Sequence, residues 1–293
     1  MPGLLITALA VTLRILANPV ANVFQKHLTA NGQHPLLVNF LTYLGLSILC
    51  LPFAFRVPWN ALSGEFWYYS VLGGIAGAMG NGFLVKALQK GDLSVLGPIN
   101  AYKSVVGIIV GIFLLGELPN VWGLAGTALI IWGSYFVLET TDEKFSWALL
   151  KRKEIQYRIW ALILTAIEAV FLKRVILASD ANTAFLSWCW FGALFSFILL
   201  QLYKISLTGF GSRTKPGHLS HYGFLILCIG TMQLSTNYVF DRMPVGYALA
   251  LFQLSALVSV WLGYRVFKEK DLSKKLLGAG IMIAGSVLII LMQ

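Results

Sequence analysis

The chain has 293 residues, of which 58% are hydrophobic and 12% are charged, and its formal net charge at pH 7 is +10. A soluble domain carries about 25% charged residues, so this composition excludes an ordinary soluble protein. The apolar residues occur in runs of about 20, the length of a helix that crosses the hydrocarbon core of a bilayer. The composition therefore predicts an all-α, polytopic membrane protein.

Ten apolar runs, taken in chain order, predict ten transmembrane helices. The first run begins at Leu4, includes Arg14 and is too long for a cleavable signal peptide, so we interpret it as a membrane span. A long polar connection, Glu139–Glu154, divides the chain near its midpoint. The predicted spans are Leu4–Gln25, Pro35–Phe55, Phe66–Leu88, Leu93–Leu115, Val121–Leu138, Tyr157–Leu177, Thr183–Tyr203, Tyr222–Phe240, Val245–Phe267 and Leu272–Leu291.

The two halves of the chain align with each other, which indicates an internal duplication. The segment "ANVFQK" (21–26) lies over "EAVFLK" (168–173), and Glu117 lies over Glu269. Because each half has five helices, an odd number, the second half inserts in the opposite direction to the first. We predict two inverted five-helix repeats over residues 1–140 and 157–293, joined by a linker over 141–156. Such repeats place a solute pathway at their interface near the bilayer midplane.

The region before the linker contains a helix, a Gly-Glu turn and a second helix. The second helix has two glycines separated by two residues and a third glycine further along. It reads "ALQKGDLSVLGPINAYKSVVGIIVGIFLLGELPNVWGLAGTALIIWGSYFVL" (87–138). A weaker copy reads "GYALALFQLSALVSVWLGYRVFKEKDLSKKLLGAGIMIAGSVLII" (246–290). In these motifs the chain resembles the drug/metabolite transporter superfamily, in particular the EamA-type carriers with ten helices. The resemblance covers nearly the whole chain and implies a transporter, without specifying the solute. One departure is that Pro98 in the fourth span corresponds to Ala250 in the second copy.

Lys103 lies near the middle of the fourth predicted span, where an uncompensated charge costs at least ~2.5 kcal/mol. On a helix, Asn100, Lys103, Ser104 and Gly107 form one polar and small stripe, which is typical of a cavity wall. The alternative is a lysine that caps backbone carbonyls in a packed bundle. We favour the cavity because Lys103 lies roughly 14 Å along the helix from Ser94, which makes snorkelling difficult.

Arg14 and Glu168 are the other charged candidates for the solute site. Arg14 lies half-way along the first span, and its guanidinium can bind a carboxylate or phosphate through two hydrogen bonds. The alternative is a structural ion pair between Arg14 and Glu168. Glu168, which has Thr165 one turn away, is either a counter-ion to Arg14 or Lys103, or a carboxyl group that takes up a proton in proton-coupled exchange.

The eighth predicted span has a polar stripe at helical spacing, made of the amides Gln233 and Asn237 and the carboxylate Asp241. Asn81 overlays Gln233 in the repeat alignment. Amides at membrane depth either bridge helices or line a pathway, and this matched pair favours the pathway. The further candidates for the wall of the solute site are Asn100, Gln253, Tyr102, Tyr43 and Trp190.

Other functional classes lack their motifs. The sequence has no GxSxG or HExxH motif and no pair of deep aspartates, so we predict no catalytic residues. It has no nucleotide-binding P-loop, which excludes built-in ATP drive. His218 and His221 have HxxH spacing, but no carboxylate or cysteine lies beside them, so we predict no metal and no other cofactor. The basic residues lie in loops and report membrane orientation, so nucleic acid is not an expected partner.

The charge of the connections indicates orientation. The connections after odd-numbered spans hold most of the basic residues, whereas those after even-numbered spans hold Arg56, Lys173, Arg174 and Arg242. The positive-inside rule places the more basic connections in the cytosol and therefore puts both termini outside. The resemblance instead implies cytosolic termini, and both orientations stay open, as do monomer and homodimer. We expect the plasma (inner) membrane. The connections after odd-numbered spans hold Lys144, Lys151, Arg152, Lys153, Arg158, Arg213, Lys215, Lys268, Lys270, Lys274 and Lys275.

The sequence therefore predicts a secondary active transporter that works by alternating access and exports or exchanges a small organic metabolite. The resemblance implies an amino acid as the solute. Two cations against one carboxylate favour a solute with a carboxylate or phosphate, so an organic-anion, sugar-phosphate or nucleotide-sugar exchanger is the alternative. An intramembrane enzyme and a non-transporting receptor are the other classes. The expected partners are the solute and the lipid bilayer, and the coupling species is open between a proton and a counter-solute.

Overall fold

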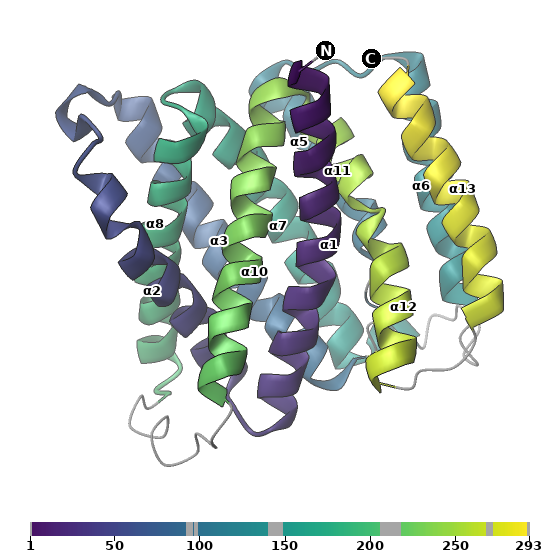
Figure 1. The fold of residues 1–293 in the computed structure, drawn as a ribbon, viewed down its shortest axis with the longest axis horizontal. Helices are drawn as coiled ribbons and strands as arrows, with labels where there is room; N and C mark the ends of the chain where they lie inside the picture. The colour runs from purple at the N-terminus through teal and green to yellow at the C-terminus, as the bar shows by residue number, and fades with distance from the viewer. Residues whose placement is uncertain are drawn as a thin grey trace.

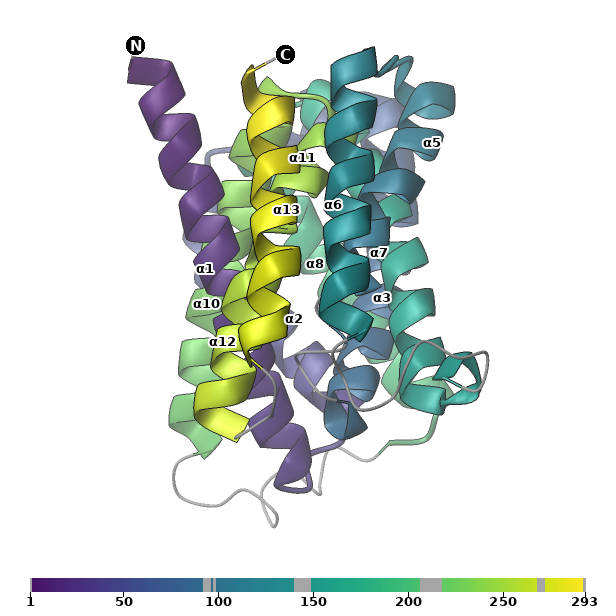
Figure 2. The same cartoon turned by 90° about the vertical axis from the view of Figure 1, so that its right-hand side faces the viewer.

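The computed structural model describes residues 2–91, 96, 99–139, 149–205, 218–267 and 272–291, and the secondary structure of these residues is entirely helical. The helices lie side by side along one axis, and both chain ends lie at the same end of the bundle (Figures 1 and 2). The long helices are α1 (Pro2–Ala30), α2 (Pro35–Ala54), α3 (Gly64–Lys90), α5 (Lys103–Leu115), α6 (Val121–Glu139), α7 (Lys153–Leu177), α8 (Ala181–Leu202), α10 (His218–Arg242), α11 (Val245–Phe252), α12 (Ser255–Phe267) and α13 (Leu272–Leu291). Three single turns of 3-10 helix are η1 (Trp59–Ala61), η2 (Asn100–Tyr102) and η3 (Leu149–Lys151).

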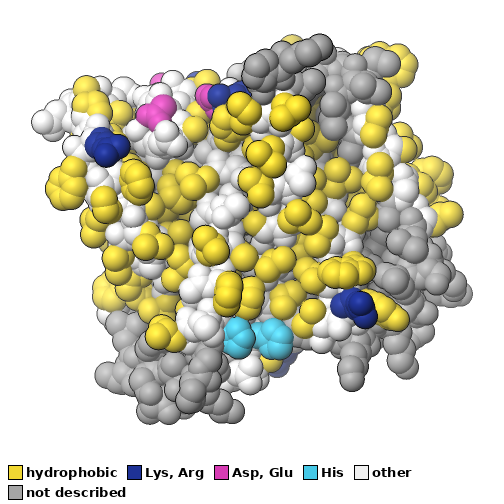
Figure 3. All heavy atoms as spheres, viewed as in Figure 1, with side chains coloured by type: hydrophobic (Ala, Val, Ile, Leu, Met, Phe, Trp, Pro, Cys, Tyr) yellow, Lys and Arg dark blue, Asp and Glu magenta, His cyan; other side chains and the backbone are white. Residues whose placement is uncertain are grey.

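Within the described residues, and with α11 and α12 taken as one interrupted span, these helices are the ten predicted spans, so the all-α membrane fold is confirmed. The face shown in Figure 3 agrees, because apolar side chains cover its middle and the coloured charged groups lie near its two ends. Six segments are long and apolar enough, by length and composition, to cross a bilayer, and the last of them combines α11 and α12: Leu5–Ala30, Pro35–Ala54, Gly64–Lys90, Ala181–Leu202, Leu219–Arg242 and Val245–Val266.

Local sequence signals set several helix ends. Ser63 precedes α3 and accepts a hydrogen bond from the Phe66 N–H, and Asp180 precedes α8 and accepts from the N–H groups of Asn182 and Thr183. These side chains satisfy donors that the first helical turn leaves unpaired. Gly116 ends α5 with φ of 69°, a left-handed conformation that favours glycine.

Two of the predicted spans are interrupted by short breaks in the helix. In the fourth span, α5 begins only at Lys103, after the single turn η2. In the ninth, α11 ends at Phe252 and α12 begins at Ser255. The cause in the ninth span is a switch of the backbone to tighter bonds, in which the N–H of Gln253 donates to Ala250 O and that of Ala256 to Gln253 O. Such a 3-10 stretch inside a helix often marks a hinge.

Helices of the two halves pack against each other in a two-fold pattern. The helix pairs α2 with α8, α5 with α11, and α6 with α13 each join corresponding helices of the two repeats, and α3 with α7 is matched by α10 with α1. α1 begins at the end of the bundle that holds the termini, whereas α7 begins at the opposite end (Figures 1 and 2). The predicted features at Pro98, Glu269 and linker residues 141–148 lie outside the described residues.

Glycines let α6 and α13 approach each other closely. A Cβ atom added at Gly133 would lie 2.6 Å from Gly278 O, and one added at Gly285 would lie 2.5 Å from Gly126 O. Contacts between backbones without side chains are a general way to pack helices in a membrane, where lipid is as apolar as leucine.

We expect Gly285→Leu to destabilise the protein by about 1–3 kcal/mol, because the new side chain overpacks the α6–α13 contact. Thermal unfolding of the detergent-purified protein measures this change. Gly280→Leu on the same helix is the matched control, because nothing lies within 4 Å of a Cβ atom at Gly280. Equal stability of the two variants would contradict the close packing of α6 on α13.

Candidate functional site

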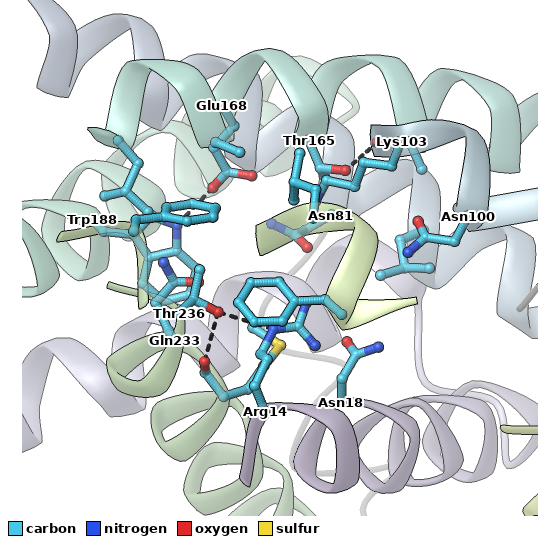
Figure 4. Close-up of a pocket in the computed structure, with 18 of the residues that line it drawn as sticks. Arg14, Asn18, Asn81, Asn100, Lys103, Thr165, Glu168, Trp188, Gln233 and Thr236 are labelled. Carbon is cyan, nitrogen blue, oxygen red and sulfur yellow. Dashed lines mark hydrogen bonds between the residues drawn. The ribbon is translucent and has the colours of Figure 1, made fainter. Parts of the chain in front are cut away.

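A cavity of about 70 Å³ lies inside the bundle, between helices of both halves. Its walls come from α1, α3, α5, α7, α8, α10 and α11, together with the 3-10 turn η2 (Figure 4). At roughly 10–15 Å³ for each water-sized group, the cavity has room for about five such groups. Charged and amide side chains line much of it, and we call it the central cavity.

Arg14 lies in the wall of the central cavity and is only 8% exposed. Its Nε donates a hydrogen bond of 2.9 Å to Thr236 Oγ1, and its guanidinium carbon lies 4.8 Å from the centroid of the Phe252 ring. Its Nη1 is buried and has no hydrogen-bond partner among the described residues. A buried donor without a partner is costly, so this nitrogen is available to an anionic ligand.

Lys103 is the first residue of α5, directly after the turn η2. It lines the central cavity, and in Figure 4 its side chain extends toward Thr165 of α7. The break in the fourth span therefore puts an ammonium group at the start of a helix, beside the cavity. Of the polar stripe predicted from the sequence, Asn100 and Lys103 line the cavity, whereas Ser104 and Gly107 do not, and Gly107 packs on Leu249.

Arg158 is a third cation of the central cavity, and the sequence analysis assigned it wrongly to a loop. It lies in the second turn of α7, is 6% exposed and donates from Nε to Leu96 O at 2.9 Å. The helical period of α7 carries the missed signal, because Arg158, Ala161, Thr165 and Glu168 all face the cavity. Reading this period back from Glu168 would have found Arg158.

Glu168 supplies the carboxylate of the central cavity. Its Oε1 accepts a hydrogen bond of 2.6 Å from Trp188 Nε1, and the residue is 7% exposed. In the described residues no direct ion pair joins Glu168 to Arg14 or Lys103. The carboxylate lies against the backbone of α3, since a Cβ atom added at Gly77 would approach its Oε1 too closely to be accommodated.

The two interrupted spans meet through their side chains. Asn100, in η2, donates from Nδ2 to Gln253 Oε1 at 3.2 Å, and Gln253 donates from Nε2 to Leu249 O at 3.0 Å. Gln253 is 1% exposed and lies at the break between α11 and α12. Each repeat therefore contributes one interrupted helix, and an amide bridge joins them beside the central cavity. Interrupted helices at the midplane are typical of secondary transporters.

The structure brings together part of the predicted set. The predicted residues that line the central cavity are Arg14, Asn81, Asn100, Lys103, Glu168 and Gln233. Lining residues that the sequence analysis did not select include Asn18, Asn22, Arg158, Trp188 and Thr236. Asn18 and Asn22 follow Arg14 at intervals of one helical turn, so the period of the first span was the available signal.

The other predicted residues lie outside the lining of the central cavity. Tyr43 accepts a hydrogen bond of 2.8 Å from Asn81 Nδ2 and borders a small adjacent cavity. Asn237 is fully buried and joins Gln233 Nε2 to the carbonyl of Ala181.

Gln253 belongs to the amide bridge described above. The remaining two candidates, Tyr102 and Trp190, do not line the central cavity. Tyr102 is 38% exposed. Trp190 packs on Trp59, with ring centroids 5.1 Å apart.

Several contacts connect the helices at the end of the bundle that holds the termini. The Nζ of Lys173 donates to the backbone carbonyls of Phe240 and Met243, and the rings of Phe240 and Phe252 lie 6.0 Å apart. Phe240 and Phe252 also line the central cavity. Aromatic and lysine contacts thus lie between the cavity and this end.

Glu117, in the connection between α5 and α6, adds a contact at the same end. Its Oε2 accepts a hydrogen bond of 2.8 Å from the N–H of Val245, the first residue of α11. Burial raises the pKa of the Glu117 carboxyl above its ordinary value, although the Val245 N–H and the charge of Lys173 oppose this shift. The first repeat thereby caps a helix of the second.

These features define an integral, multi-pass membrane protein with a polar cavity between inverted repeats. Residues 6–139 match the model of the EamA-like transporter family, which confirms the resemblance found in the sequence and indicates a membrane transporter of the drug/metabolite type. A solved structure titled "Crystal structure of protein" is similar in fold, with a TM-score of 0.72 at 15% identity over 98% of this chain and 96% of that chain. No curated protein matches the chain.

A double-mutant cycle tests the contact between Gly77 and Glu168. We expect Gly77→Ala to lower the stability of the detergent-purified protein, because the added methyl group displaces the carboxylate. Removing the carboxylate by Glu168→Ala makes room for that methyl group, so the second substitution offsets part of the first. The expected coupling is about 0.5–3 kcal/mol, measured by thermal unfolding of all four proteins. Additive changes would contradict the placement of Glu168 against α3.

Proposed function

We propose that this protein is a secondary active transporter that exports or exchanges a small organic solute with a carboxylate or phosphate group. The observation that carries the proposal is the buried Nη1 of Arg14, which has no hydrogen-bond partner in the part of the chain that the structure describes. It lies in the wall of the central cavity, which Lys103 and Arg158 also line. A charge at the middle of a membrane is costly unless it faces water or a partner. An anionic solute that binds among these three cations supplies that partner.

An amino acid is the first candidate solute. It carries a carboxylate and an ammonium group, and the central cavity contains both Arg14 and Glu168 as complementary charges. In this arrangement the solute carboxylate binds Arg14 and Lys103, and the solute ammonium binds Glu168. A volume of about 70 Å³ suits a solute with few heavy atoms.

A specific observation favours the second candidate, an organic anion such as a sugar phosphate or a nucleotide sugar. Arg158 adds a third cation to the two that the sequence predicted, against the single carboxylate of Glu168. This excess of positive charge suits a solute with more than one negative charge. Under this alternative the protein exchanges one anion for another.

Alternating access uses the two repeats, which we assign to residues 1–140 and 157–293 with a linker over 141–156. The amide bridge between Asn100 and Gln253 joins the interrupted helices, where small backbone changes can reorient helix segments. The hydrogen bond between Glu117 and the N–H of Val245 connects the repeats at the end that holds the termini, so we infer that this end is the closed one. Proton uptake by Glu168 or exchange against a counter-solute drives the cycle, and we place the protein in the plasma membrane.

Solute counterflow in proteoliposomes tests the proposal. We expect vesicles preloaded with an unlabelled amino acid to accumulate the labelled one, and we expect Arg14→Gln or Lys103→Gln to reduce the rate at least about tenfold. Losing one partner of a buried charge interaction costs about 2–5 kcal/mol, and 1.4 kcal/mol corresponds to about tenfold. Arg242→Gln is the control, since Arg242 is exposed and pairs with Asp241 at the end of α10. Equal counterflow in all variants would contradict the site.

The same assay separates the two solute classes. Glu168→Gln is expected to abolish counterflow of an amino acid, because the solute ammonium loses its carboxylate. It is expected to leave counterflow of a phosphate-bearing anion intact or improved. Counterflow of neither class, in protein that remains folded by gel filtration, would contradict the proposed transport of an anionic solute.

A further inference from the structure

A second and larger cavity opens on the outer surface of the bundle, between α2, α8 and α10. Its volume is about 650 Å³, and it shares no lining residue with the central cavity. Figure 1 shows α8 between α2 and α10 on this side of the molecule, and both neighbours pack against α8. We call this cavity the outer groove. Because the helices around it span the membrane, the groove faces the bilayer.

The walls of the outer groove are apolar along most of its length. Leu49 and Phe53 of α2 are 63% and 60% exposed, and Leu227 and Leu234 of α10 are 65% and 44% exposed. Water in such a groove would face hydrocarbon on all sides and find few polar partners. An apolar chain is therefore the occupant that these walls accept.

One end of the outer groove is polar. Arg56 follows the last turn of α2, and Asp180, Asn182 and Thr183 begin α8, so these residues lie where two membrane helices end and begin. This is the level of the lipid headgroups. The groove thus has apolar walls in the hydrocarbon region and a cation at its headgroup end.

The two charged groups at this polar end, Asp180 and Arg56, differ in whether their side chains already have hydrogen-bond partners. The carboxylate of Asp180 already accepts hydrogen bonds from the N–H groups of Asn182 and Thr183 and from Thr183 Oγ1, at 2.8, 3.1 and 2.5 Å. Arg56 is exposed, and its side chain makes no hydrogen bond or ion pair with another described residue. A guanidinium group is well suited to two hydrogen bonds with a phosphate. The free charge of the groove therefore selects an anion.

We propose that the outer groove binds one glycerophospholipid of the surrounding bilayer, with an acyl chain between α2 and α10 and its phosphate at Arg56. Along the groove, apolar walls are followed by a cation at the headgroup level. In the lipid, the acyl chains are followed in the same order by the phosphate. α2 belongs to the first repeat, and α8 and α10 belong to the second. The lipid therefore lies where the repeats meet, and this site is separate from the proposed solute site.

Photo-cross-linking tests this proposal with the full-length protein. The protein is reconstituted in phosphatidylcholine vesicles that contain a trace of phosphatidylcholine with a photoactivatable acyl chain, and mass spectrometry maps the adducts. We expect adducts on peptides with Leu49, Phe53, Leu227 and Leu234 to exceed, at least about threefold, those at Phe113. Phe113 is the internal reference for bulk lipid, since it is apolar and 82% exposed on α5. Equal labelling of the groove and of Phe113 would overturn the proposal.

Two variants test the role of the phosphate. Arg56→Gln is expected to reduce the groove adducts at least about threefold and to leave those at Phe113 unchanged. Arg242→Gln, which removes an exposed arginine at the same end of the bundle but outside the groove, is expected to change neither. Thr231→Trp fills the groove and is expected to reduce its adducts without any change of charge.

Other occupants give different results. A photoactivatable hydrocarbon without phosphate is the second probe, and groove labelling by it that equals labelling by the phospholipid would overturn the assignment of Arg56. Cross-linked dimers through the groove would show a second copy of the chain there instead of lipid. If Arg56→Gln does not fold, the comparison of the two probes on the unaltered protein decides the question.

Discussion

The cost of holding charge at the middle of a bilayer is the constraint on which this structure depends. Arg14, Arg158 and Glu168 are each less than a tenth exposed, in helices that cross the membrane. Each is stabilised by one fixed partner: Thr236 Oγ1 for Arg14, the Leu96 carbonyl for Arg158 and the Trp188 N–H for Glu168. These partners hold the charges without neutralising them, so the balance of charge is left to water or a solute in the central cavity.

The inverted repeat explains why a cavity exists at this position. Corresponding helices of the two repeats pack against each other, and the interrupted spans meet through the Asn100–Gln253 bridge beside the cavity. Two tightly packed helices, α6 and α13, lie against each other through glycines. The proposed solute site thus lies where helices are interrupted, and the close glycine contacts lie elsewhere. The proposed lipid at α2, α8 and α10 would act on the contact between repeats from outside.

The sequence predicted the ten spans and the family resemblance because hydropathy and glycine pattern depend on local residues. It predicted Lys103, Arg14 and Glu168 because a deep charge is visible in any apolar run. It missed Arg158, which lies near the start of a helix and was therefore assigned to a loop. It also placed Tyr102 and Trp190 in the cavity wall, although one is partly exposed and the other packs on Trp59. Aromatic side chains are common along this chain, and only the relative rotation of the helices decides which of them face inward.

The most direct test of this account is the accessibility of the central cavity to water. Cys50, Cys189 and Cys228 are free and would be replaced first. Single cysteines at Thr165, in the cavity wall, and at Ala166, which is fully buried and faces away from it, are then treated in membranes with a small hydrophilic thiol reagent. The account predicts that the thiol at 165 reacts and that at 166 does not. No reaction at 165 from either side of the membrane would contradict a wet chamber around the buried charges.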